Sequence, residues 1–175
     1  VGAKLLFPSG DVQHSGVILG PNDFTAGHAH RHLSRDDSGY RNASRALRNF
    51  SAVTAACMLT RTDLFQDVGG FDEQHFPIAY NDVDYCLRLL ARGFRTVCTP
   101  DALLRHNQAA TRGKTFHPNA EYASRTELRR RWFPTLRNDP YYNPHLSLHD
   151  EHFHMRSHPH GTRILFASHN LAYEG

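Results

Sequence analysis

The chain has 175 residues, of which 39% are apolar and 21% are charged. This length fits one domain with its own core rather than two, and this composition is that of a globular protein rather than a disordered or fibrous one. Twenty Lys and Arg against seventeen Asp and Glu give a net charge of +3, spread along the chain, which does not indicate a nucleic-acid binder.

The cysteines and the hydropathy of the chain indicate the compartment in which the protein is expected. Cys57, Cys86 and Cys98 are odd in number and lack a C-x-x-C spacing, so neither a disulfide framework nor a zinc ribbon is indicated and we expect a reducing compartment. No stretch approaches the about 18 consecutive apolar residues that a membrane-spanning helix needs. We therefore predict a cytoplasmic protein without a transmembrane segment, associated at most peripherally with the inner face of a membrane.

The first third of the chain predicts a hairpin followed by a long loop. Residues 4–7 and 12–19 have the composition and alternation of strands, and the Pro-Ser-Gly-Asp sequence between them is a turn. Residues 21–49 are polar and without a sustained period, which predicts a long loop. Long loops in compact domains are usually functional.

The middle of the chain alternates extended and helical patterns. Residues 51–60 are small and apolar, which predicts a buried strand. A short helix over Thr62–Asp67 follows, capped by Thr62 and ended by Gly69 and Gly70. A clear helix then begins with Asn81 or Asp82 as its N-cap and ends at Gly93. Its apolar stripe has the spacing i, i+3, i+4 and i+7, at Val83, Cys86, Leu87 and Leu90.

The last third predicts two short strands, a second helix and a tail. The strands are residues 94–99, ended by Pro100, and residues 102–105; the helix covers residues 119–132, with Asn119 as its cap. Glu121 with Arg125, and Glu127 with Arg131, have the i, i+4 spacing that supports an exposed helix. Residues 134–161 predict a surface-wrapping tail, and residues 163–167 a new strand. The strand–helix alternation indicates the α/β class.

Three side chains stand where this class often carries chemistry. Asp82 and Asp84 lie at a predicted helix N-terminus, where the helix dipole favours a charged carboxylate able to act as a base. His106 follows one helix and one strand later, at a strand end. An Asp and a His brought together there would suit a metal-assisted group transfer. The alternatives are a plain N-cap for Asp82 and a solvated loop histidine for His106.

The segment from 55 to 106 resembles the second half of the catalytic domain of family 2 glycosyltransferases. The matching elements are A-A-C at 55–57, R-x-x-x-F-x-x-V-G-G-F-D-E at 61–73, N-D-V-D-x-x-L-R-x-x-x-x-G-F-R at 81–95, Pro100 and His106. Residues 1–20 and the D-P-Y-Y-N-P sequence at 139–144 also resemble this family. The resemblance implies a GT-A, Rossmann-like fold. It also implies inverting transfer of a sugar from a nucleotide-sugar donor to a glycan or polysaccharide acceptor, with Mg²⁺ or Mn²⁺ as cofactor.

The same resemblance assigns roles to residues. Asp82 corresponds to the general base and His106 to a position that helps to bind the metal, while Arg112, in the loop after it, would contact the diphosphate. The acceptor would be contacted by Gly69, Gly70, Asp72, Glu73, Asn81 and Asp84. Simpler alternatives stay open: a helix stop for the glycines, a solvated loop pair for Asp72 and Glu73, and a surface ion pair for Arg88. Asn81 replaces a Glu that is common in the family, which removes one charge.

The ends of the sequence suggest a piece of a longer protein. The chain begins at Val1 and lacks the nucleotide-binding half with its Asp-x-Asp, so residues 1–155 are expected to be an acceptor-side part that is inactive alone. Residues 156–162 would be a linker. Residues 163–175 resemble the first strand of a GT-B, family 4-like glycosyltransferase domain.

Two groups of histidines and two rival functions complete the predictions. The tract from His145 to His160 has the composition of a metal site, but we interpret it as polar linker sequence. We apply the same caution to His28, His30 and His32, whose loop would border the acceptor cleft. The rivals to the enzyme are a non-catalytic, degenerate GT-A scaffold or carbohydrate-binding module, and a His-dependent metal hydrolase.

Overall fold

In the computed structural model, which describes residues 1–107 and 118–156, a four-stranded sheet has the order β2-β1-β6-β5. Strand β6 runs parallel to β1, while β2 and β5 run antiparallel to their neighbours. A second sheet pairs β3 with β4. The strands are β1 (Gly2–Leu6), β2 (Val12–His14), β3 (Val17–Leu19), β4 (Ala26–His28), β5 (Arg48–Phe50) and β6 (Thr96–Arg105).

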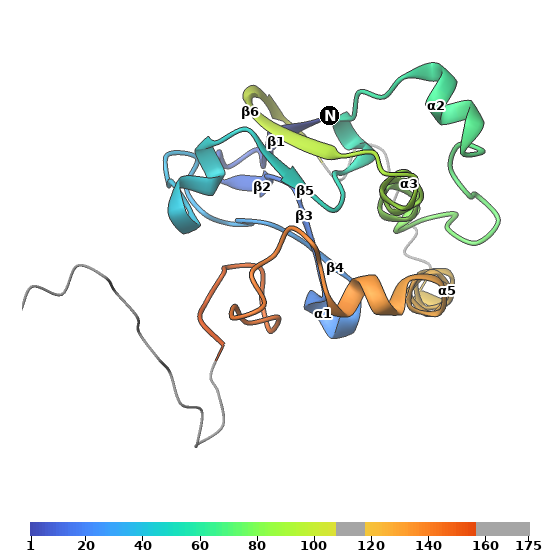
Figure 1. Cartoon of the computed structure of the whole chain (residues 1–175). Coiled ribbons are helices and arrows are strands. Elements are labelled where there is room, and N and C mark those ends of the chain that lie inside the picture. Colours follow the sequence, from blue (N-terminus) through green and yellow to red (C-terminus); the bar gives the residue numbers. More distant parts are fainter. Residues whose placement is uncertain (108–117, 157–175) are drawn as a thin grey trace, which may run out of the picture.

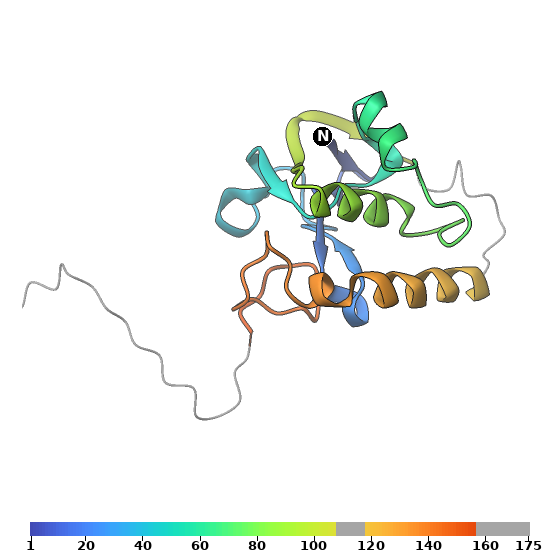
Figure 2. The ribbon, with the colours of Figure 1, turned by 45° about the vertical axis from the view of Figure 1, so that its right-hand side comes forward.

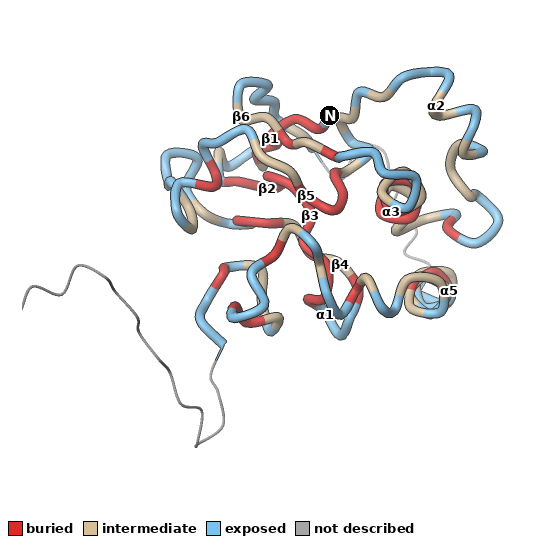
Figure 3. Tube along the Cα trace, in the orientation of Figure 1, coloured by how far each residue is buried: buried red, intermediate tan, exposed pale blue. Residues whose placement is uncertain are grey.

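The two longest helices, α3 and α5, lie together on one side of the larger sheet (Figures 1 and 2). Figures 1 and 2 show α3 between the larger sheet and α5. The core lies between them, where α3 buries Tyr85 and Leu87 and α5 buries Leu128 and Leu136. Figure 3 shows buried residues on α3 and along β1. The helical elements are α1 (Pro21–Phe24), η1 (Tyr40–Arg45), η2 (Ala55–Cys57), α2 (Thr62–Asp67), α3 (Asn81–Ala91) and α5 (Pro118–Arg137). The α/β class and the three longer helices are therefore confirmed.

The hairpin of β1 and β2 is also confirmed, but its second strand is shorter than predicted. The chain leaves the larger sheet at Gly16, whose φ of +106° suits glycine. It re-enters extended structure as β3, in the other sheet. The predicted strand over residues 12–19 is thus two strands, because the backbone turns at the glycine.

The predictions for residues 21–49 and 51–60 are wrong. The predicted loop over residues 21–49 contains β4, β5, α1 and η1. The predicted strand over residues 51–60 is extended and buried only as far as Val53, because the Thr54 side chain accepts a hydrogen bond from the N–H of Ala56 and starts the turn η2. Beyond that turn the segment forms an isolated bridge, not a ladder.

The helix caps differ from the predicted ones. Arg61 occupies the N-cap of α2 and Tyr80 that of α3, in neither case with a side-chain cap, so Thr62, Asn81 and Asp82 lie inside the first turns. Likewise, α5 begins at Pro118, one residue before Asn119. Proline suits this first position because its missing N–H would have no helical partner there.

The two strands predicted on either side of Pro100 are one strand. β6 continues through the proline because Ala3 pairs with Thr99 and the next residue, Lys4, pairs with Leu103. The skipped residues form an irregularity that removes the need for a ladder N–H at Pro100. The predicted tail also differs, since Tyr142, Leu146 and Phe153 are buried. The predicted strand at 163–167 lies outside the described residues, and so does most of the predicted linker.

Candidate functional site

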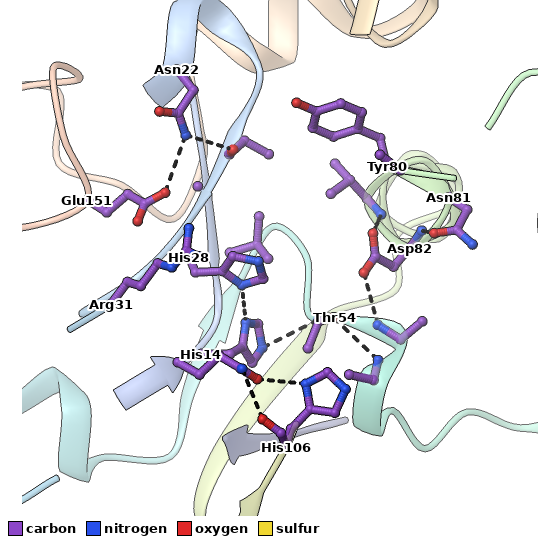
Figure 4. Close-up of a pocket in the computed structure, with 18 of the residues that line it drawn as sticks. His14, Asn22, His28, Arg31, Thr54, Tyr80, Asn81, Asp82, His106 and Glu151 are labelled. Atoms are coloured by element: carbon purple, nitrogen blue, oxygen red, sulfur yellow. Dashed lines mark hydrogen bonds between the residues drawn. The ribbon is translucent and has the colours of Figure 1, made fainter. Parts of the chain in front are cut away.

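A cleft of 620 Å³ opens between the start of α3 and the β3–β4 sheet. Asn81 and Asp82 line one side, while His28 and Glu151 lie on the opposite wall in Figure 4. His106 lines it from the end of β6. The other lining residues are Gln13, His14, Val17, Asn22, Ala26, Gly27, Arg31, Thr54, Ala55, Ala56, Ala79, Tyr80, Val83 and Glu121.

Asp82 is fixed at this cleft by backbone donors. The N–H of Ala55 donates to Oδ2 (3.0 Å) and the N–H of Val83 to Oδ1 (2.9 Å). Each carboxylate oxygen keeps a further lone pair, since one hydrogen bond uses only part of its accepting capacity. A carboxylate so oriented in an open cleft can take a proton from a bound hydroxyl.

The turn before α3 brings Asp82 to the cleft. Tyr80 has the left-handed φ of +65°, and its carbonyl accepts the Asp84 N–H (2.9 Å), which begins the helix. A left-handed aromatic residue is uncommon and costs on the order of 1–2 kcal/mol. Residues with such strain cluster at functional sites, and eight other non-glycine residues of the described chain also have a positive φ.

His106 is held in one orientation by Gln13. Its Nδ1 lies 2.8 Å from the Gln13 Oε1, and the Gln13 amide donates back to the His106 carbonyl (3.2 Å). Because an amide oxygen only accepts, Nδ1 carries the hydrogen and Nε2 keeps its lone pair. A ring nitrogen oriented by such a partner is typical of a metal ligand.

The donor set for a metal is nevertheless partial. Within residues 1–107 and 118–156 no group of three or more His, Cys, Asp or Glu is arranged to hold a metal ion. His106 therefore fits a divalent ion as a single ligand. The same finding leaves the described part of the histidine tract without a metal site; His154, for example, bonds Asp150 instead (2.9 Å).

Asp84 has a different environment from Asp82. Its side chain is fully buried and contacts the Arg88 guanidinium (2.8 Å), Arg131 (3.3 Å) and the Trp132 indole N–H (2.9 Å). Asp84 is not among the described residues that line the cleft. These contacts indicate that Asp84 helps to hold α3 in position. The predicted contact of Asp84 with the acceptor stays a prediction.

Arg88 is more than a surface ion pair. Besides Asp84, its guanidinium donates to the backbone carbonyls of Val68 and Gly70 (2.5 and 2.6 Å). It therefore fixes the glycine-containing loop to α3. The alternative of an isolated surface pair, given above for Arg88, is wrong.

Asp72 shares a partner with Asp84. Its Oδ2 lies 2.8 Å from the Arg131 guanidinium and 3.0 Å from the His75 ring. Partial burial alone would raise the pKa of Asp72, but the hydrogen bonds from His75 and Arg131 lower it to about 2. Asp72 is thus an ionised member of a network, not a solvated loop residue.

The remaining predicted acceptor residues lie at the loop before this network. Gly69 and Gly70 have φ of +83° and +65°, and both of their N–H groups bond back to the last turn of α2, so they end that helix. Glu73 is exposed. None of the three is among the described cleft residues. Their acceptor contacts stay predictions, and Arg112 lies outside the described residues.

Sequence patterns did not single out several residues of the cleft. His28 was expected near it, because its loop was placed at the border, and it does line the wall. Gln13 and His14 lie in the stretch of residues 1–20 that resembles the family, but the resemblance gave neither of them a role, and Glu151 lies in no motif. Burial, and then the neighbouring His28, lowers the pKa of His14 well below its usual 6.5, so His14 is neutral.

Comparison with known proteins gives the family. A family model described as "Glycosyltransferase like family 2" matches residues 24–135, more than half of the chain. The "O-antigen biosynthesis protein RfbC" of Myxococcus xanthus is 41% identical over 160 residues, which is 91% of this chain and 12% of that protein. The "Uncharacterized protein y4gI" of Sinorhizobium fredii is 40% identical over 151 residues, 85% of this chain and 16% of that protein.

A shorter match has a more specific name. An "N-acetylglucosaminyl-diphospho-decaprenol L-rhamnosyltransferase" of Mycobacterium tuberculosis is 37% identical over 62 residues, 35% of this chain and 20% of that protein. No solved structure matches the chain. The chain thus spans a fifth or less of each of these relatives.

Proposed function

Since the chain belongs to glycosyltransferase family 2 and has the mixed α/β fold of a partial GT-A domain, we propose that it forms the acceptor side of an inverting glycosyltransferase. The enzyme would move a sugar from a nucleotide-sugar donor to a glycan or polysaccharide acceptor. The observation that carries this proposal is the Asp82 carboxylate, held by two backbone N–H groups at the cleft.

Inverting transfer needs one base on the acceptor side. The acceptor hydroxyl attacks the anomeric carbon as the bond to the diphosphate breaks, and the hydroxyl proton passes to the base. Asp82 supplies an oxygen with spare accepting capacity at the wall of the cleft. The Ala55 and Val83 N–H groups hold this carboxylate in place before the acceptor binds.

His106 is the residue that would hold a divalent ion on this side of the cleft. Gln13 orients its ring and leaves Nε2 with a lone pair. When bound, Mg²⁺ or Mn²⁺ neutralises charge that develops on the leaving diphosphate. Further ligands would have to come from outside the described residues, since these hold no complete donor set.

The names of the relatives indicate the biological setting. One relative is named for O-antigen biosynthesis and another for transfer to a decaprenol-linked acceptor. We therefore propose a role in assembling a cell-envelope polysaccharide, in the cytoplasm at the inner face of the membrane. In the part of the chain that the structure describes, no helix is long and apolar enough to span a bilayer.

Replacing Asp82 tests the proposal in the full-length protein that contains this chain. Asp82→Asn keeps the size but has one acceptor oxygen, so it can keep only one of the two backbone contacts that the carboxylate makes with Ala55 and Val83. It also removes the proton acceptor, so kcat should fall by about 10²–10⁴. The dissociation constant of the nucleotide-sugar, measured by calorimetry, should change little. The matched control is Asp101→Asn, an exposed carboxylate in the irregular part of β6, which should retain turnover.

Two outcomes would contradict the proposal. Turnover by Asp82→Asn at the wild-type rate would exclude Asp82 as the base. Binding of donor and glycan by the wild-type protein without any transfer would instead favour the non-catalytic carbohydrate-binding module.

A further inference from the structure

The cleft wall opposite Asp82 combines hydrogen-bond donors and acceptors from distant parts of the chain. His28 ends β4, and Asn22 lies in α1 just before that strand. Glu151 comes from the segment after α5, and its carboxylate accepts a hydrogen bond from the Asn22 amide (3.3 Å). Figure 4 shows these side chains on the side of the cleft that faces Tyr80 and Asp82. We call His28, Asn22 and Glu151 the polar wall.

His14 fixes which nitrogen of His28 carries the hydrogen. The backbone N–H groups of Gly16 and Thr54 both donate to Nε2 of His14 (3.3 and 3.4 Å). That nitrogen must therefore be unprotonated, and the neutral ring carries its hydrogen on Nδ1. The Nδ1 of His14 lies 2.8 Å from the Nδ1 of His28, so His14 donates and His28 accepts. His28 consequently carries its own hydrogen on Nε2.

Burial makes this arrangement hard to reverse. His14 is 1% exposed and stacks edge-to-face with His28 at 5.0 Å. The opposite tautomer would set an N–H of His14 against two backbone N–H groups, and a buried donor without an acceptor costs about 1–3 kcal/mol. The His28 ring is therefore a fixed Nε2–H donor on the wall of the cleft.

Gly27 gives Glu151 its place beside this donor. A Cβ at Gly27 would lie 2.6 Å from the Glu151 Oε1 and 2.8 Å from its Cγ, closer than atoms can approach. The backbone carbonyl of Glu151 also accepts the His30 N–H (3.3 Å). The absence of a side chain at Gly27 thus lets the Glu151 carboxylate lie against β4, next to His28.

We propose that the polar wall binds the hydroxyl groups of a sugar ring, with His28 Nε2–H as donor and the Glu151 carboxylate as acceptor. This inference rests on the proposed glycosyl transfer and adds binding residues to it. A sugar presents hydroxyls that both donate and accept, and it matches a wall that does both. A phosphate presents only acceptors, and Glu151, Asp82 and Glu121 line the same cleft and would repel it. Arg31 also lines the cleft, so the three carboxylates outnumber one cation there.

The tautomers are tested directly on the 175-residue chain. Two-bond ¹H–¹⁵N correlation spectra of histidine-labelled protein at neutral pH distinguish a protonated from an unprotonated ring nitrogen. We expect the hydrogen on Nδ1 in His14 and on Nε2 in His28. A hydrogen on Nε2 of His14, or on Nδ1 of His28, would overturn the donor assignment.

Ligand binding is tested on the same signals with two probes. Methyl glycosides of common hexoses should shift the His28 resonances, while those of the exposed His154 should stay unchanged. Inorganic pyrophosphate is the second probe. A His28 response to pyrophosphate alone would make the wall an anion site, and no response to either probe would also contradict the proposal.

Gly27→Ala is the matched variant, because it displaces the Glu151 carboxylate without removing it. It should weaken glycoside binding about tenfold, the loss expected for one charge-assisted hydrogen bond, and Glu151→Gln should also weaken it. Asp101→Asn serves as the control and should bind as the wild type does. Unchanged binding by Gly27→Ala and Glu151→Gln would exclude Glu151 from the site.

This test separates the wall from the proposed base. Asp82→Asn should keep the His28 response to glycosides even though it loses transfer. If the wild-type protein transfers sugar but shows no His28 response to glycosides, only the polar wall is contradicted. If Asp82→Asn keeps both the glycoside response and turnover, only the assignment of Asp82 as the base is contradicted.

Discussion

Arg131 joins three carboxylates from different parts of the chain. It contacts Asp72 in the loop before α3 (2.8 Å), Asp84 in α3 (3.3 Å) and Glu127 one turn back in α5 (2.5 Å). Its guanidinium also lies 5.1 Å from the centre of the buried Phe76 ring. Because Asp84 is fully buried, its charge has to be compensated by such partners. Arg131 therefore ties the helix that carries Asp82 to α5.

Removing this arginine should destabilise the protein. Arg131→Met keeps much of the apolar stem but leaves Asp84 with Arg88 as its remaining cation, so we expect a loss of about 3 kcal/mol in the free energy of unfolding. Urea denaturation measures it. The neighbouring Arg130 has a side chain that is 68% exposed and pairs with Glu127 at the surface, so Arg130→Met should leave the midpoint unchanged. Equal shifts for the two variants would refute the network's role.

Single residues of the site were predictable to different degrees. Asp82 and His106 stand in motifs from which the family resemblance implies their roles; these roles stay predictions, and both residues line the cleft. Glu151 was not predictable, because its position beside His28 depends on how the segment after α5 packs on β4. The burial of Asp84 was equally invisible, since a D-x-D pattern at a helix start does not say which carboxylate faces inward.

At the scale of elements, Gly16 decides how the first strands are divided between two sheets. A Cβ there would lie 2.3 Å from the Phe50 ring, and φ is +106°. Gly10, in the turn between β1 and β2, has a similar φ of +99°, but nothing lies within 4 Å of its Cβ position. The two glycines therefore share the backbone strain of a substitution and differ in the steric contact.

Alanine at these two positions should separate strain from crowding. Both variants place an L-residue at positive φ, which lowers the free energy of unfolding by on the order of 1 kcal/mol. Gly16→Ala also forces the buried Phe50 to move, which adds a loss of about 1–3 kcal/mol. Thermal unfolding followed by circular dichroism compares them. Similar melting temperatures for the two variants would show that Phe50 can move without cost, contrary to the packing described here.

Element length explains which parts of the fold the sequence could predict. The eleven residues of α3 carry a full apolar stripe, and tertiary packing agrees with it. The strands β3, β4 and β5 have three residues each, too few for a period, so their pairing is decided by distant partners. The prediction that a strand ends at Pro100 was wrong for a similar reason. Local rules end a strand at a proline, but β6 continues past Pro100 because the ladder skips its pairing there.

At the scale of the whole molecule, the segment after α5 is held on the body by aromatic stacking around His30. The His30 ring stacks on Phe153 at 4.6 Å, and Phe153 also contacts Tyr40 and Tyr142. His30 Nδ1 bonds the Ser15 hydroxyl (3.1 Å), while its Nε2 is buried without a partner among the described residues. Burial, with the nearby cations of Arg48 and Lys4, lowers the pKa of His30 to about 4.

This lowered pKa makes the fold sensitive to mild acid. Above pH 6.5 both the folded and the unfolded His30 are neutral and stability does not depend on it. Below pH 6.5 His30 binds a proton in the unfolded chain, but in the folded chain it stays neutral down to about pH 4. The free energy of unfolding therefore falls as the pH falls through this window. The loss from His30 between pH 7 and pH 5 should be about 2 kcal/mol. His14, whose pKa is also lowered, adds to it with the same sign.

His30→Phe tests the assignment because phenylalanine keeps an aromatic ring for the stack on Phe153 and cannot titrate. The free energy of unfolding, measured by urea titration at pH 7 and at pH 5, should fall by about 2 kcal/mol less in the variant than in the parent. Burial raises the pKa of Asp139, which has the opposite effect on stability, but both proteins share it and it cancels in the comparison. Between pH 7 and pH 8 the two proteins should differ by a constant. An identical loss in parent and variant between pH 7 and pH 5 would mean that His30 is already protonated in the fold or accessible to water, and the segment after α5 would not be the acid-sensitive part of the molecule.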